Sequence, residues 1–122
     1  MDETTIGKLD SELKRHYGEE KIQRKVLADG TVAFKIAAAE LPEGCNPGRV
    51  DALLFFQGGN GSPQVFVRQQ VKLANGRIAR NQTNVIFDGE PWVSFSANFL
   101  YDVSKPIWYF VGGKLRRFAQ PD

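Results

Sequence analysis

The chain has 122 residues, of which 16 are basic, 14 are acidic and 42% are hydrophobic. This length predicts a single domain over residues 1–122 with one core, and the small net charge of +2 argues against a nucleic-acid partner. The longest apolar runs, 52–56 and 107–111, are far shorter than the roughly 20 residues that span a bilayer, which argues against a membrane protein.

Residues 4–17 predict an amphipathic helix. Ile6, Leu9 and Leu13 recur at helical spacing with charged residues between them, and Gly18 follows as a stop signal. We therefore expect an N-terminal helix that packs one face on the core.

Four apolar segments then predict an antiparallel meander. The dipeptide Asp29-Gly30 suits a hairpin turn between the first two segments, and the apolar residues that alternate from Val32 to Ile36 should face the core. The third segment reads as buried on both faces toward its end. The predicted strands are 22–27, 31–36, 50–56 and 65–71.

The last third of the chain predicts a long loop and a C-terminal helix. From Leu73 to Gly89 the apolar period is lost, which favours a functional loop. Residues 106–118 fit a helix, because Pro106 suits a first helical turn, although Gly112-Gly113 could turn a hairpin instead. The predicted fold class is α+β.

The order of these elements, with the segment Asn75-Gly76-Arg77-Ile78-Ala79, resembles the ubiquitin-conjugating (UBC) fold. In that family an Asn-Gly-x-Ile-Cys segment carries the catalytic cysteine, and a tryptophan follows about a dozen residues later. Here Ala79 takes the cysteine position and Trp92 is the later tryptophan. The resemblance implies an active-site loop of Asn75, Gly76, Arg77, Ile78 and Trp92, with residue 79 at the mouth of a shallow groove.

A divergent prokaryotic branch of the same superfamily is similar over most of the chain. The matching stretches are Leu41-Pro42-Glu43-Gly44, the run Leu53 to Phe56, Pro63, and Trp92 to Ser96. The chain departs from the family before Asn75, where no His-Pro-Asn triplet is present. The asparagine of that triplet is the family's expected stabiliser of the oxyanion.

Alanine at position 79 decides what chemistry the resemblance can imply. Transfer of a ubiquitin-like tail needs a nucleophile that forms a thioester or oxyester, and a methyl group forms neither. Three interpretations follow: a naturally inactive variant, a conjugating enzyme whose cysteine has been replaced by alanine, or an accidental similarity.

The resemblance implies a protein-binding role in a bacterial ubiquitin-like conjugation pathway, in some relatives one of antiphage defence. The implied partner is a ubiquitin-like protein, an activating enzyme or an active conjugating enzyme. Candidate contacts are the basic residues Lys8, Lys14 and Arg15 of the first helix. No cofactor or metal is expected, because His16 is the only histidine and has no apparent partner ligands.

A rival interpretation is an α+β domain that binds a small molecule or nucleic acid. Its pocket or stacking surface would be formed by Trp92, Phe95, Trp108 and Tyr109. The single cysteine, Cys45, excludes an internal disulfide and, with no apolar leader after Met1, indicates the cytoplasm. We expect Cys45 to be structural, since it lies in a loop rich in proline and glycine.

Overall fold

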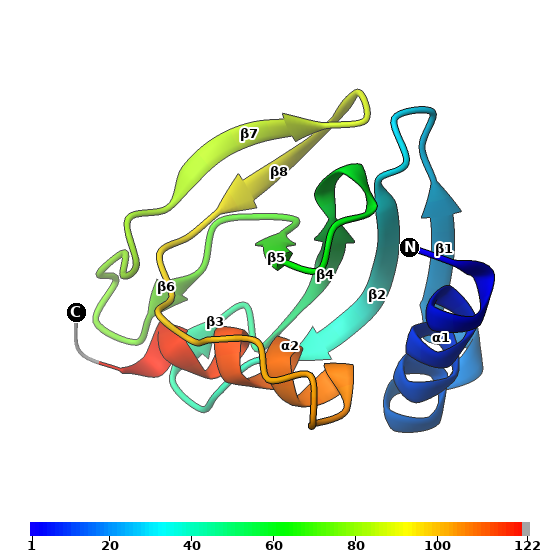
Figure 1. Ribbon diagram of the computed structural model, residues 1–122. Helices are drawn as coiled ribbons and strands as arrows, with labels where there is room; N and C mark the ends of the chain where they lie inside the picture. The colour runs from blue at the N-terminus through cyan, green and yellow to red at the C-terminus, as the bar shows by residue number, and fades with distance from the viewer. Residues whose placement is uncertain (121–122) are drawn as a thin grey trace.

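A computed structural model, which describes residues 1–120, confirms the α+β class (Figure 1). The main sheet is antiparallel with six strands in the order β1-β2-β4-β5-β8-β7, and β3 pairs with β6 separately. The helices are α1 (Glu3–Tyr17) and α2 (Ile107–Arg116). The strands are β1 (Ile22–Val26), β2 (Val32–Glu40), β3 (Cys45–Asn46), β4 (Arg49–Phe56), β5 (Pro63–Val67), β6 (Lys72–Leu73), β7 (Thr83–Phe87) and β8 (Glu90–Ser94).

The predicted N-terminal helix is confirmed as α1. The side chain of Asp2 caps it by accepting a hydrogen bond of 2.8 Å from the backbone N–H of Thr5. Gly18 ends it with a φ of 112°, a conformation that residues with a Cβ rarely adopt. The apolar stripe of Ile6, Leu9 and Leu13 is buried against the sheet.

The central strand β4 is buried on both faces. Ala52, Leu54 and Phe56 belong to the large core on the side of the helices, which we call the inner face. Leu53 and Phe55 point the other way, into a smaller apolar cluster on what we call the outer face. Both faces of the sheet therefore need a cover.

The β7–β8 hairpin provides the outer cover, and here the sequence prediction was wrong. Residues 83–94 form two strands where a loop was expected through residue 89, so the sheet has six strands instead of four. The turn is a two-residue one with φ of 50° at Asp88 and 77° at Gly89. β7 was missed because none of its residues is fully buried, so its apolar alternation is weak.

The hairpin separates from β5 after a single pair of residues, Val67 with Val93. The next outward-facing position of β8 is Pro91, which has no N–H to offer a neighbouring strand. The pairing with β5 therefore stops, and the hairpin can turn across the outer face.

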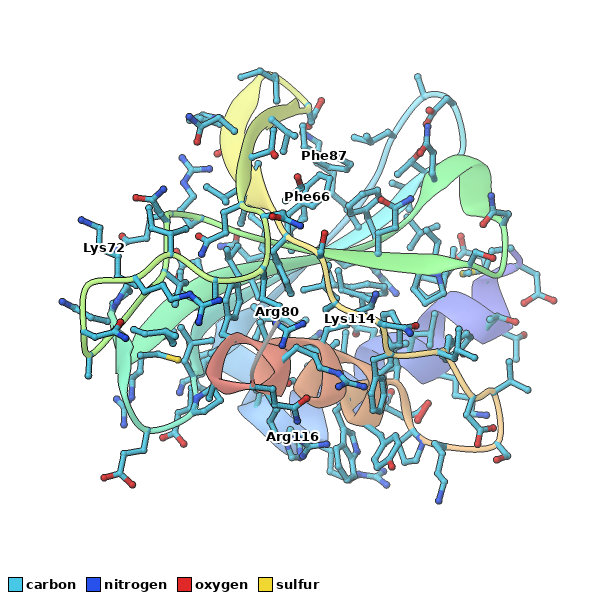
Figure 2. The ribbon with its side chains drawn as sticks, turned by 90° about the vertical axis from the view of Figure 1, so that its left-hand side faces the viewer. Phe66, Lys72, Arg80, Phe87, Lys114 and Arg116 are labelled. Atoms are coloured by element: carbon cyan, nitrogen blue, oxygen red, sulfur yellow. The ribbon has the colours of Figure 1, made fainter. Side chains whose placement is uncertain are left out.

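The tip of the hairpin is fixed to the far side of the sheet. Phe87 packs on Phe55 of β4, with ring centroids 4.8 Å apart. Asp88 forms an ion pair with Lys25 of β1. Figure 2 shows Phe66 and Phe87 on the side of the sheet where the hairpin lies.

The predicted C-terminal helix is also confirmed, with Pro106 at the N-cap and not in the first turn. The helix contains two glycines, which disfavour a helix interior, and packing accounts for one of them, Gly113. A Cβ at this position would clash with the ring of Phe99, in the segment before the helix. At Gly112, no described residue apart from its chain neighbours and the backbone of its own helix comes within 4 Å of such a Cβ.

The two glycines should respond in opposite directions to substitution by alanine. Gly112→Ala should raise the free energy of unfolding by about 1 kcal/mol, because alanine is the better helix former and space is free. Gly113→Ala should lower it by about 1 to 3 kcal/mol, because the Phe99 ring must move. Urea unfolding followed by circular dichroism measures both, and equal effects of the two variants would contradict the packing of Phe99 on Gly113.

Candidate functional site

The segment Asn75–Ile78 forms a tight exposed turn between β6 and β7. The backbone N–H of Gly76 donates to the carbonyl of Leu73 at 2.8 Å, and that of Arg77 to the side-chain oxygen of Asn75 at 2.9 Å. Gly76 has a φ of 80°, which accounts for glycine at this position. Ile78, at the end of the turn, is 46% exposed.

Ala79 is buried, with only 2% of its surface exposed, so the expected place at the mouth of a groove is wrong. The side-chain amide of Gln82 connects the backbone at Ala79 to the backbone at Val71. Its nitrogen donates to the carbonyl of Ala79 at 2.9 Å and to that of Val71 at 2.7 Å. The side chain at position 79 thus faces the interior while Ile78 faces solvent.

Arg80 fastens this segment to the end of α2, where Figure 2 places its side chain near the helix. Its guanidinium donates to the carbonyls of Arg117 at 2.8 Å and Gln120 at 2.7 Å. The carbonyl of Arg80 in turn accepts a hydrogen bond from the backbone N–H of Ser96 at 2.7 Å. These contacts hold Arg80 at a φ of 69°, which is unfavourable for a residue other than glycine.

Trp92 does not lie in the turn with which the sequence grouped it. It is 2% exposed and packs in the outer cluster with Leu53 and Phe55. The guanidinium of Arg68 lies 5.0 Å from its ring centroid. Trp92 is therefore a core residue of the outer face.

An ion-pair network lies beside Trp92 and was not predicted. Glu90 accepts a hydrogen bond from Lys35 at 2.7 Å and one from Arg68 at 3.2 Å, at the wall of a hollow of about 280 Å³. The bond from Lys35, then the charges of Lys35 and Arg68, lower the pKa of Glu90. Glu90 lies in β8, Lys35 lies in β2 and Arg68 directly follows β5, so no sequence motif joins them.

The basic residues predicted as partner contacts all lie on α1. Lys14 pairs with Asp10 one turn earlier at 2.9 Å. Lys8 and Arg15 are exposed and border a hollow of about 360 Å³ together with Trp108. The structure thus brings Lys8 and Arg15 together at one open surface and engages Lys14 within the helix.

Cys45 lies closer to the Asn75–Ile78 turn than its sequence position indicated, because its strand partner is Leu73 at the base of that turn. The thiol is half-buried, and burial raises its pKa. At neutral pH this reduces the thiolate fraction that would be needed for nucleophilic attack. The interpretation of Cys45 as a structural residue remains a prediction.

The aromatic residues of the rival interpretation do not form one surface. Trp92 packs on the outer face, whereas Phe95 packs on Phe118 with ring centroids 4.4 Å apart. Trp108 stacks on His16 at 4.3 Å, and Tyr109 contacts Phe99. Within residues 1–120 there is also no group of three or more histidine, cysteine or acidic side chains placed to hold a metal ion, and no helix that could cross a membrane.

No family model, curated protein or solved structure matches this chain.

The burial of position 79 can be tested with two neighbouring thiols. In a Cys45→Ser background, the thiol of Ile78→Cys should react readily with Ellman's reagent under native conditions. The thiol of Ala79→Cys should react at least about tenfold more slowly, because it needs local opening of the segment. Both should react alike in urea, and equal native rates would contradict the burial of residue 79.

The network around Glu90 predicts a pH-dependent contribution to stability. Because its pKa in the folded state is lowered, its carboxylate stabilises the fold above the ordinary value of 4.5, and this contribution is lost as the pH falls through the folded-state value. Glu90→Gln should thus be less stable than the parent at pH 7, with the difference disappearing in acid. The control Glu43→Gln changes an exposed loop residue and should leave the stability unchanged at every pH.

Proposed function

We propose that the chain is a non-catalytic UBC-like domain of a ubiquitin-like conjugation pathway, which binds a ubiquitin-like protein, an activating enzyme or an active conjugating enzyme. The observation that carries this proposal is Ala79. It stands where the resemblance requires a reactive thiol, and the residue is 2% exposed. Neither its chemistry nor its accessibility permits a covalent intermediate.

The arrangement of the chain supports the proposal. An N-terminal helix precedes antiparallel strands, the Asn75–Ile78 turn follows β5, and a C-terminal helix packs on the same face of the sheet as the first. The β7–β8 hairpin is the main departure from the expected order. It covers the outer face and leaves the Asn75–Ile78 turn exposed.

The burial of position 79 also favours binding over the alternative of an enzyme whose cysteine was replaced. A thiol at that position would be shielded by the same hydrogen bonds from Gln82 to the carbonyls of Ala79 and Val71. Attack on an activated partner would require that shell to open. A binding role makes no such demand.

The surface of α1 around Lys8 and Arg15 is the best candidate for the contact. Both side chains are exposed, and within the described part of the chain neither forms an ion pair with an acidic residue. They flank a hollow whose wall includes Trp108 and Pro106. Basic side chains beside a partly buried aromatic ring suit a partner surface that is acidic with an apolar centre.

Charge reversal on α1 tests this surface. The double variant Lys8→Glu, Arg15→Glu should bind the cognate ubiquitin-like protein or activating enzyme at least about tenfold more weakly by isothermal titration calorimetry, because like charges would face each other. The matched control reverses Arg24 and Lys72, which are exposed on β1 and β6, and should bind as the parent does.

Two results would contradict the proposal. One is the absence of binding between the parent chain and each purified component of the pathway. The other is a thiol-sensitive adduct on the parent chain in the presence of ATP, activating enzyme and ubiquitin-like protein. Such an adduct would make Cys45, the only thiol, a nucleophile.

A further inference from the structure

The main sheet ends in two strand edges, and they differ in how they are protected. In the described part of the chain, β1 pairs with β2 alone and carries the exposed side chains of Gln23, Arg24 and Lys25. Charged residues on an edge strand are a common device against unwanted pairing. Within residues 1–120, β7 pairs with β8 alone, and its sequence Thr-Asn-Val-Ile-Phe has no charge, proline or glycine. The edge of β7 is therefore open to an additional strand.

The hairpin register shows which backbone groups of β7 face outward. The two-residue turn makes Phe87 and Glu90 a hydrogen-bonded pair, and the ladder alternates from there. The N–H and C=O groups of Asn84 and Ile86 consequently point away from β8. The side chain of Ile86 is 72% exposed beside them.

A hollow of about 300 Å³ lies next to this edge. Phe55 and Phe66 of the sheet contribute to its lining, together with Leu27 and Ile86. The two aspartates on its border are already engaged, Asp88 by Lys25 and Asp29 by the backbone N–H of Thr31 at 2.9 Å. The hollow thus offers the rings of Phe55 and Phe66 to an apolar side chain, while the carboxylates of Asp29 and Asp88 stay at its border.

The edge is also held in a fixed position. The tip of the hairpin is tied to β1 through Asp88 and to β2 through Glu90, and Phe87 is packed on Phe55. A strand that is already ordered loses little conformational entropy when another strand pairs with it.

We infer that the β7 edge is a docking site for an uncharged, extended segment of another protein, which adds as a strand and places an apolar side chain in the hollow. Such binding takes its affinity from main-chain hydrogen bonds and its selectivity from side-chain pockets. The inference is independent of Ala79 and of α1, which carry the proposed function.

A second copy of the chain fits this edge less well. The five residues of β7 span only about 17 Å, so a symmetric pair of these strands would bury far less than the roughly 1,200 Å² of a stable interface. An extended segment can pair with the edge and fill the hollow at the same time.

The probe is a pool of capped heptapeptides in which threonine alternates with valine, isoleucine, leucine or phenylalanine, added to the ¹⁵N-labelled protein. The expected result is that the amide resonances of Asn84 and Ile86 shift most. Ile86→Lys, which gives β7 the protection that β1 already has, should abolish the shifts. Val26→Lys, at the 54% exposed Val26 of β1, should leave them unchanged.

A pool of the same peptides N-methylated at alternate residues should cause no shifts, because it lacks the donors for a ladder. The inference is overturned if the unmethylated pool leaves β7 unmoved, or if methylated peptides or Ile86→Lys give equal shifts. It is also overturned if the same amides shift with protein concentration alone, since the occupant would then be a second copy.

Discussion

The burial of β4 on both of its faces is the constraint on which the rest of the structure depends. Full burial of a large apolar side chain is worth about 1.5 to 3 kcal/mol. The helices cover Leu54 and Phe56, but Leu53 and Phe55 would be left in water without a second cover. The β7–β8 hairpin is that cover, and its single pair of residues with β5 lets it cross the sheet instead of extending it.

The need for this cover gives a structural role to a residue that the sequence analysis assigned to an active-site loop. Trp92 follows the Asn75–Ile78 turn in sequence, yet its ring is needed over Leu53 and Phe55. Glu90 then lies within hydrogen-bonding distance of Lys35 in β2 and of Arg68, which directly follows β5, and these bonds connect the hairpin to the rest of the sheet. The polar network and the aromatic cluster stabilise the same cover.

The elements that the sequence predicted are those whose apolar residues recur regularly because they face the large core. α1, the strands around β4, and α2 each bury a regular series of side chains, and all were expected. Their bounds were less accurate, because β2 runs on to Glu40 instead of ending at residue 36 and β5 ends at Val67 instead of residue 71. The hairpin was missed although Asp88-Gly89 is as good a turn signal as Asp29-Gly30. The reason is that β7 buries no residue fully and β8 contains Pro91, so neither shows the alternation of an ordinary strand.

That the segment around Ala79 is a functional site stays a prediction, and its geometry could not be read from the sequence. The segment around Ala79 was singled out, but its burial depends on Gln82 and Arg80, whose partners at Val71, Arg117 and Gln120 cannot be read from the motif. Arg80 and the next residue, Asn81, both have positive φ, at 69° and 45°, and such conformations cost about 1 to 3 kcal/mol each. The hydrogen bonds of Gln82, Arg80 and Ser96 offset this strain, and in doing so they turn residue 79 inward. A buried position of this kind accepts only a small side chain, because a larger one would have to displace the closing backbone. The hydrogen bonds that hold this segment thus leave Ile78 in solvent and place residue 79 in the interior.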